Sequence, residues 1–126
     1  MKITHIGMYV TDLEKARAYY MTYFGAVSNE KYVNEKGFSS YFLRFDTDTS
    51  LELMHHVELE TVHHPEKSNG LSHLAFSVGS KEAVLALTKR ITTDGYELYS
   101  DPRTTGDGYF ESCVTDPDGN RIEITI

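Results

Sequence analysis

ITHIGMYVTDLEKA (Ile3–Ala16) and LSHLAFSVGSKEAV (Leu71–Val84) are two versions of one segment, and together they decide the fold. Aligned without a gap, they place His5 on His73, and the apolar residues that follow coincide. Each segment begins with the alternation of a strand and continues into the spacing of a helix. An internal repeat of this kind indicates a chain built from two similar modules.

The rest of the chain repeats one order of elements. Four strands are expected in the first module, at Ile3–Val10, Ala26–Val33, Phe38–Asp46 and Ser50–Val57. Four are expected in the second, at Leu71–Val78, Tyr96–Ser100, Tyr109–Thr115 and Arg121–Ile126. The helices are expected to begin at the capping residues Asp12 and Ser80, and Gly25 is a residue type that often ends one. The predicted fold class is α+β, a single domain of two tandem βαβββ modules (about 1–57 and 71–126) with a polar linker at about 58–70.

Composition limits the kinds of partner. The chain has 126 residues, a formal net charge of −7 and no cluster of Lys or Arg, which argues against nucleic acid. No apolar stretch approaches the roughly 20 residues that a membrane helix needs. Cys113 is the only cysteine, so no intrachain disulfide can form, and a reducing cytoplasm is the expected location. A small molecule is the expected partner.

Strand alternation separates each strand into an apolar and a polar face, and four residues stand out on the polar faces: His5, Glu52, His73 and Glu123. Taken alone, a histidine on a strand is more often a surface residue than a ligand. The repeat places two of them in register, and two imidazoles with two carboxylates suit Zn²⁺, Ni²⁺, Co²⁺, Mn²⁺ or Fe²⁺ better than Ca²⁺. The sequence therefore predicts one divalent metal ion.

At these residues the chain resembles the vicinal oxygen chelate superfamily, and within it the glyoxalase I-like proteins. The resemblance rests on THIGMYVTDLEKARAYY, LELMHH, GLSHLAFSV and TDPDGNRIEI. It implies a cup-shaped mixed sheet around one metal, with His5 and Glu52 from the first module and His73 and Glu123 from the second. It also implies a lactoylglutathione lyase type of activity and a homodimer. In that activity a proton moves through a metal-bound enediolate of a thiohemiacetal or related α-hydroxycarbonyl, with Glu123 and Glu52 as catalytic residues.

Glu52 helps to choose among relatives. Fosfomycin-resistance enzymes and extradiol dioxygenases resemble the same fold but typically lack a carboxylate at this position, and bleomycin-binding members lack the ligands altogether. Four intact ligands favour proton-transfer chemistry. Two alternatives stay open: an Fe(II)-dependent ring-cleaving dioxygenase, and a non-catalytic binding or resistance protein.

Four further residues are candidates for substrate binding: Tyr9, Arg103, Tyr109 and Arg121. Bacterial glyoxalase I commonly has Arg at the position of Tyr9, where it is associated with a carboxylate of glutathione. A neutral tyrosine cannot replace that charge. Arg121 shares a strand face with Glu123 and is the preferred arginine for a substrate carboxylate.

For the remaining histidines and for Cys113 we expect structural roles rather than functional ones. Four histidines lie close together in sequence but lack a spacing that fixes their geometry, and we expect solvated surface rather than a second metal site for His55, His56, His63 and His64. Cys113 is expected to be a small buried filler, since no neighbouring base in the sequence marks it as a nucleophile.

Overall fold

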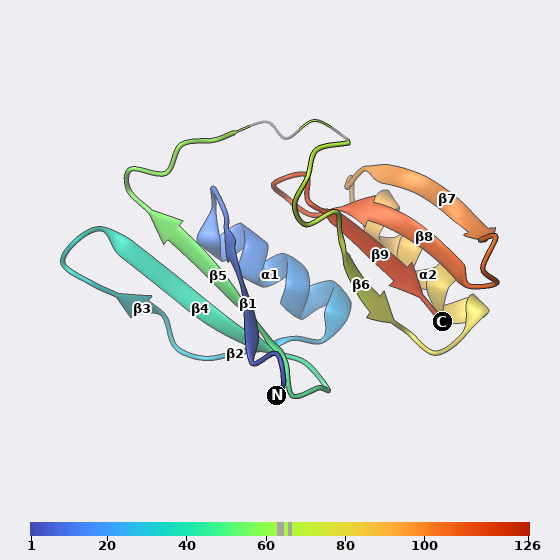
Figure 1. Cartoon of the computed structure of the whole chain (residues 1–126), viewed down its shortest axis with the longest axis horizontal. Helices are drawn as coiled ribbons and strands as arrows, with labels where there is room; N and C mark the ends of the chain where they lie inside the picture. Colours follow the sequence, from blue (N-terminus) through green and yellow to red (C-terminus); the bar gives the residue numbers. More distant parts are fainter. Residues whose placement is uncertain (63–64, 66) are drawn as a thin grey trace. The chain divides into compact units, whose positions relative to one another are not determined.

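Two units, Met1–Pro65 and Glu66–Ile126, make up the computed structural model, which describes residues 1–62, 65 and 67–126. Each unit contains one helix and its own mixed sheet (Figure 1). The order of elements in the second unit repeats that of the first, so the predicted α+β fold of two βαβββ modules is confirmed. In the part of the chain that is described, no helix is long and apolar enough to cross a membrane.

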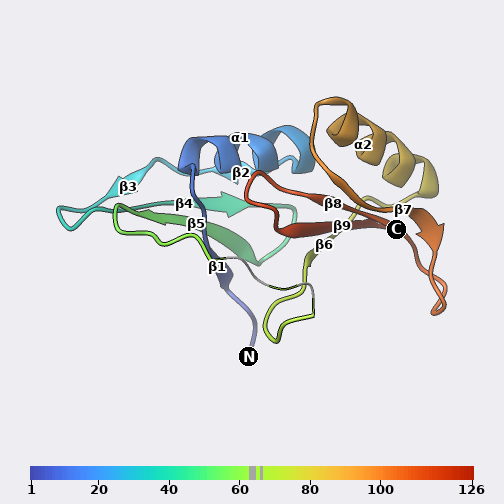
Figure 2. The ribbon, with the colours of Figure 1, turned by 90° about the horizontal axis from the view of Figure 1, so that it is seen from above.

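The helix of the first unit lies on one face of its sheet (Figure 2). Its elements are β1 (His5–Tyr9), α1 (Leu13–Phe24), β2 (Val27–Ser28), β3 (Tyr32–Val33), β4 (Phe38–Arg44) and β5 (Ser50–His56). The strand order is β1-β5-β4-β2, with β3 also paired to β4; β1 and β5 are parallel and the other pairs are antiparallel.

Both ends of α1 form as the sequence predicts. The Asp12 side chain accepts a hydrogen bond from the Lys15 backbone N–H at 2.9 Å and caps the first turn. Gly25 ends the helix with φ of 66°, a left-handed conformation in which glycine is favoured. The helix packs on its sheet through fully buried tyrosine side chains, Tyr19 and Tyr20.

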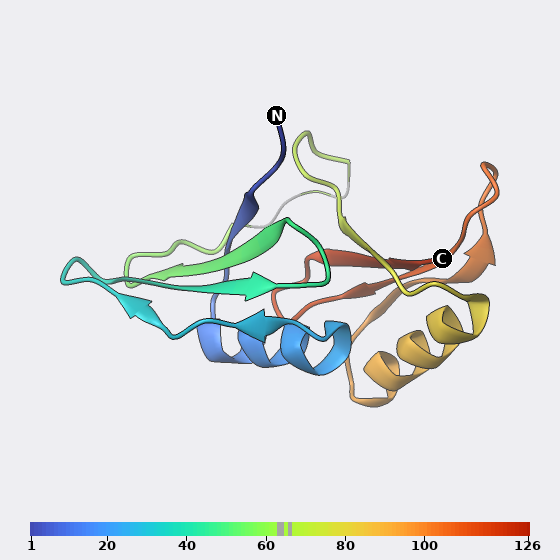
Figure 3. The same cartoon turned by 90° about the horizontal axis from the view of Figure 1, so that it is seen from below.

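The segment after α1 differs from the prediction. One strand is expected over Ala26–Val33, but the structure has two short strands, β2 and β3, which follow one another along β4 (Figure 3). Asn29 lies between them, and its side-chain Oδ1 accepts a hydrogen bond from the Phe42 N–H at 2.7 Å. An asparagine side chain that takes the place of a backbone acceptor in this way interrupts a strand.

The second unit contains β6 (Leu74–Ser77), α2 (Lys81–Thr93), β7 (Leu98–Thr104), β8 (Phe110–Thr115) and β9 (Arg121–Thr125). Its strand order is β6-β9-β8-β7, again with one parallel pair, β6 and β9. The Ser80 side chain caps α2 by accepting a hydrogen bond from the Ala83 N–H. The prediction was wrong for β7: it ended that strand at Ser100, whereas the strand continues through register shifts to Thr104.

Alternation along the strands divides each sheet into a helix-covered face and an opposite face. On β9, Ile122 and Ile124 are fully buried beneath α2, whereas Glu123 between them is on the opposite face. On β5, Leu51 and Leu53 are buried in the same manner. The helix-covered faces therefore hold the apolar cores, and the chemistry is on the opposite faces.

Candidate metal centre

In the first unit a histidine and a glutamate meet on the face away from α1. Nε2 of His5 lies 3.8 Å from Oε2 of Glu52. β1 and β5 are parallel with Gly7 opposite Glu52, so His5, two residues before Gly7, points to the same side as the glutamate. The other ring nitrogen, Nδ1, lies 3.2 Å from Thr4 Oγ1. The His5 and Phe42 rings also pack in a T-shaped arrangement, with centroids 5.4 Å apart.

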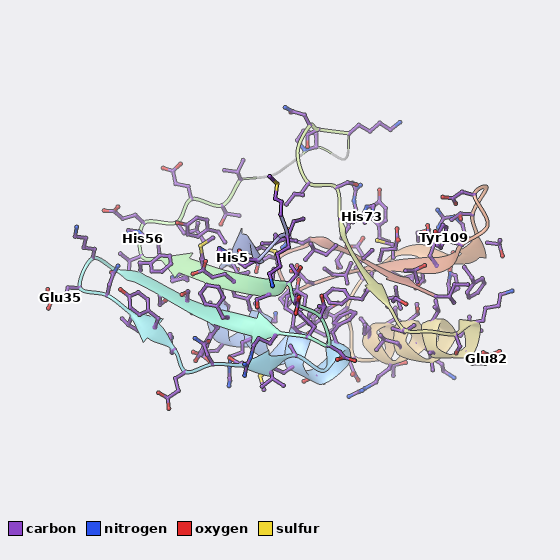
Figure 4. All side chains as sticks on the ribbon, turned by 60° about the horizontal axis from the view of Figure 1, so that its bottom comes forward. His5, Glu35, His56, His73, Glu82 and Tyr109 are labelled. Carbon is purple, nitrogen blue, oxygen red and sulfur yellow. The ribbon has the colours of Figure 1, made fainter. Side chains whose placement is uncertain are left out.

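The second unit repeats this arrangement. Nε2 of His73 lies 3.5 Å from Oε2 of Glu123. Ala75 is opposite Glu123 in the parallel pair of β6 and β9. His73 comes two residues before Ala75, as His5 comes two residues before Gly7, and therefore points to the same side as the glutamate. Nδ1 of His73 lies 3.3 Å from Ser72 Oγ. Figure 4 labels both histidines, His5 on β1 and His73 before β6.

A small residue opposite each glutamate leaves space beside the pair. In the first unit that space is filled: a Cβ added to Gly7 would lie 3.0 Å from Cε of Met54. The Met54 side chain therefore covers β1 next to the His5–Glu52 pair. Any larger residue at Gly7 would displace this thioether.

The donor set and its spacing fit a divalent ion. Two donors bound at about 2.1 Å to one tetrahedral ion lie roughly 3.4 Å apart, and the two N···O distances are 3.5 and 3.8 Å. In each pair Nδ1 of the imidazole lies near a hydroxyl, so that Nε2 is the ring nitrogen on the carboxylate side; a metal-bound histidine typically has an outer-shell partner on its second nitrogen in the same way. Within residues 1–62, 65 and 67–126, no three His, Cys, Asp or Glu side chains gather as a metal-binding group. The structure therefore brings the predicted ligands together as two pairs, one within each unit.

Glu111, which is not among the site residues predicted from the sequence, lies on the same face as the second pair. In the antiparallel pair of β8 and β9, Cys113 is opposite Glu123 and Glu111 is opposite Thr125. Burial raises the pKa of Glu111, and the nearby charge of Glu123 raises it further, against the opposing effect of Arg103. The sequence shows that Glu111 and Cys113 are two residues apart and so share a strand face. It does not show that Cys113 is opposite Glu123, and that register is what places Glu111 near the second pair.

Cys113 is half-buried on this face rather than a fully buried filler. Burial raises the pKa of its thiol to about 11, and the charge of Glu123 acts in the same direction. The thiol is therefore protonated near neutral pH and is a weak nucleophile.

The predicted substrate-binding residues fall in different surroundings. Tyr9 is at the end of β1, on the same face as His5, with about half of its surface exposed. Tyr109 is exposed beside the turn between β7 and β8 (Figure 4). The guanidinium of Arg121 lies over the Tyr99 ring, 4.3 Å from its centroid. Their binding roles stay predictions.

Arg103, the fourth candidate, is held by two neighbours. Its Nη1 donates a hydrogen bond to Ser100 Oγ at 2.6 Å, and its Nη2 lies 3.4 Å from Oε1 of Glu111. Arg103 thus forms an ion pair with Glu111, the residue that shares a face with His73 and Glu123.

The other histidines do not form a metal-binding group among the described residues. Nδ1 of His55 lies 3.1 Å from the Val10 carbonyl oxygen, and Nδ1 of His56 accepts a hydrogen bond from the Glu58 N–H. His63 and His64 lie outside the described residues.

One protein-family model matches the chain across both modules. Residues 2–124 match the model of the Glyoxalase/Bleomycin resistance protein/Dioxygenase superfamily. The chain belongs to this superfamily. Membership confirms the predicted resemblance and accounts for the repeat of one βαβββ module along almost the whole chain.

Three known proteins illustrate the range of superfamily relatives. The uncharacterised protein YqjT of Bacillus subtilis is 33% identical over 95% of this chain and 94% of its own length. A probable trivalent organoarsenical cleaving enzyme of Bacillus subtilis is 31% identical over 98% of this chain and 78% of its own. Glyoxalase I from Zea mays is similar in structure, with a TM-score of 0.81 at 22% identity. That match covers 98% of this chain and 44% of the maize protein and supports the fold alone.

Proposed function

We propose that this superfamily member is a metal-dependent, glyoxalase I-like lyase or isomerase. The observation that carries the proposal is the matched construction of the pairs His5–Glu52 and His73–Glu123. One pair from each module would give a divalent ion two imidazole nitrogens and two carboxylates, which balance its charge. The expected ion is Zn²⁺, Ni²⁺, Co²⁺, Mn²⁺ or Fe²⁺.

The proposed chemistry is a proton transfer next to a carbonyl group. A bound divalent ion would supply Lewis acidity toward a carbonyl oxygen of the substrate. Glu123 is the residue proposed to take and return the proton at its carboxylate oxygens, with Glu52 as the second catalytic carboxylate. The two side chains are 20% and 16% exposed, which limits competition from water for these oxygens.

The proposed substrate class is a thiohemiacetal or related α-hydroxycarbonyl. Glutathione conjugates are expected to be poor substrates unless Arg103 or Arg121 compensates, because Tyr9 offers no positive charge for a carboxylate. Arg103, Tyr109 and Arg121 belong to the second unit, which also contains the His73–Glu123 pair, and these three residues are proposed to contact the substrate. A small molecule is the proposed partner.

Cleavage of an organoarsenical is a second candidate, because a relative at 31% identity is described as a probable enzyme of that type. Trivalent arsenic bonds preferentially to thiolate sulfur. Cys113 is the only cysteine in this chain and its thiol is protonated near neutral pH, so a pair of thiolates is not available from one chain. The proton-transfer proposal is therefore the better supported one.

The experiment loads purified protein with each candidate metal and measures conversion of methylglyoxal hemithioacetals of glutathione and of small thiols. We expect turnover that depends on the metal and is lost in Glu123→Gln. An iron-dependent dioxygenase would instead consume O₂ with Fe²⁺ and tolerate Glu52→Gln. Absence of both activities with every metal, together with retained ligand binding, would favour the non-catalytic binding alternative.

We also propose that the chain is a cytoplasmic homodimer. Each unit would supply two of the four proposed ligands. The complementary pair can come either from the same chain or from a second copy of the chain. Superfamily membership supports pairing in general. The cytoplasmic location rests on the single cysteine.

A further inference from the structure

Irregular pairing in β7 turns two polar side chains to one face of the second unit. Ser100 lies opposite Cys113 on β8. Arg103 lies opposite Glu111, so three steps along β7 match two steps along β8. An extra residue of this kind is a β-bulge, which redirects the side chains beyond it. Pro102 is in the irregular stretch, on an edge strand where a missing N–H is tolerated.

The bulge lets Ser100 and Arg103 meet although they are three residues apart. Arg103 donates a hydrogen bond from Nη1 to Ser100 Oγ at 2.6 Å, and its Nη2 lies 3.4 Å from Oε1 of Glu111. The Glu111 side chain is only 15% exposed, whereas that of Arg103 is 53% exposed. Ser100 and Glu111 therefore hold the guanidinium in place, and the half-exposed side chain still presents N–H groups to solvent.

This anchored guanidinium lies near the His73–Glu123 pair. Cys113 is opposite Glu123, and Glu111 is two residues further along β8, about 7 Å at the rise of a strand. The charges of Glu123 and His73 both influence Glu111, which agrees with this proximity. A molecule bound at the pair thus reaches Arg103 with a short chain of atoms.

The charges around Arg103 determine which kind of ligand group can bind to its guanidinium. Glu111 balances one positive charge, and Asp107 adds a further negative charge nearby. A dianion such as phosphate is repelled by these carboxylates, whereas a planar monoanion matches the hydrogen-bonding fork of a guanidinium. We propose that Arg103 binds a carboxylate of the substrate and that Glu111 is the positioning residue that holds Arg103 in place. This inference rests on the proposed function, because the substrate is placed at the metal pair.

The test compares two probes of equal length that differ in one group. Glutaric monohydroxamate and pentanohydroxamic acid both chelate metal through the hydroxamate, but only the first carries a carboxylate at its far end. Their Kd values are measured by calorimetry on the cobalt-loaded full chain. We expect the native protein to bind the carboxylated probe about tenfold more tightly, the size of effect typical of a charged hydrogen bond.

Variants assign this preference to its residues. Arg103→Ala should bind both probes equally, and the control Arg90→Ala on α2 should keep the native preference. Glu111→Gln should reduce the preference severalfold, and Glu111→Asp should restore part of it. The inference is overturned if native protein shows no preference, if Arg103→Ala keeps it, or if Glu111→Gln increases it, since an increase would mean that Glu111 acts only as a repelling charge.

The cobalt absorption spectrum separates this result from failure of the proposed function. If cobalt does not bind, the metal assignment fails, and the same two probes are titrated into metal-free protein and followed by the amide NMR shifts of Thr104 and Thr105. A carboxylate-specific shift that disappears in Arg103→Ala would uphold the inference. Identical shifts with both probes would overturn it.

Discussion

Nε2 of His73 lies 3.5 Å from Oε2 of Glu123, because the parallel pairing of β6 and β9 places Ala75 opposite the glutamate. The first unit uses the same register, with Gly7 in the place of Ala75. Each module therefore repeats a histidine, a small residue and a facing glutamate. The repeat therefore preserves a histidine–glutamate pair as well as a fold.

The hydroxyls beside the histidines give the first prediction. Thr4→Val and Ser72→Ala each remove the partner of an Nδ1 atom, at 3.2 and 3.3 Å. Outer-shell partners of this type commonly contribute at least about tenfold to metal affinity, so we expect a loss of about that size in zinc Kd by competition with a chelator. Ser77→Ala, on the same unit, is the control and should bind as native protein does. Native affinity in both hydroxyl variants would show that the hydroxyls do not orient the rings.

A second prediction concerns stability and pH in the first unit. Lys31 Nζ lies 3.0 Å from Glu14, the Tyr41 hydroxyl donates to Glu14 at 3.0 Å, and these contacts, Lys31 foremost, lower the pKa of Glu14. A lowered folded-state pKa stabilises the protein above the unfolded value of 4.5, and that stability is lost as pH falls through the folded pKa. We expect Glu14→Gln to lower the free energy of unfolding at pH 7 by less than about 1 kcal/mol, since the pair is exposed.

The measurement is urea denaturation of native and Glu14→Gln protein between pH 7 and pH 3. The difference should shrink below pH 4.5, whereas the control Glu35→Gln, an exposed glutamate between β3 and β4 (Figure 4), should show no such trend. A difference that stays constant down to pH 3 would contradict the assigned sign.

A third prediction concerns glutathione. Tyr9 offers no positive charge to a carboxylate of glutathione, so metal-loaded protein should turn over the methylglyoxal–glutathione adduct slowly unless Arg103 or Arg121 compensates, and Tyr9→Arg should lower KM. Tyr32→Arg, which changes another exposed tyrosine of the first unit, is the matched control. A native kcat/KM near 10⁶ M⁻¹s⁻¹, well within the usual range of enzymes, would show that the argument from Tyr9 is wrong.

The fourth prediction is the assembly. With metal bound, light scattering at micromolar concentration should give twice the 14.3 kDa mass of the chain. Removal of the metal by a chelator should weaken the dimer if the pairs of two copies share an ion. A monomeric mass with metal bound would exclude shared ions.

The sequence predicted the two modules and the candidate ligands because both depend on local pattern. Strand alternation is a property of a few consecutive residues, so the faces of Glu52 and Glu123 followed from their neighbours. The repeat also contained Thr4 and Ser72 in register, but hydroxyls are too common for that match to stand out without the Nδ1 contacts.

Other features depend on partners distant in sequence. Asn29 splits a predicted strand because its side chain bonds to Phe42, which no local pattern reveals. The β7 bulge is defined by pairing with β8, so the shared face of Arg103 and Glu111 was not predictable from alternation. The sequence favoured Arg121 because it shares a strand face with Glu123, and in the structure its guanidinium lies over the Tyr99 ring.

The central claim is that both His–Glu pairs hold one divalent ion. The most direct test is metal content by mass spectrometry, after native protein and variants are loaded with zinc and dialysed. The account predicts about one ion per chain in native protein, the stoichiometry of a four-ligand site. Disruption of either pair, by His5→Ala or by His73→Ala, should remove the ion, and His56→Ala should retain it. Two ions per chain, or a full ion retained after either pair is disrupted, would contradict the claim.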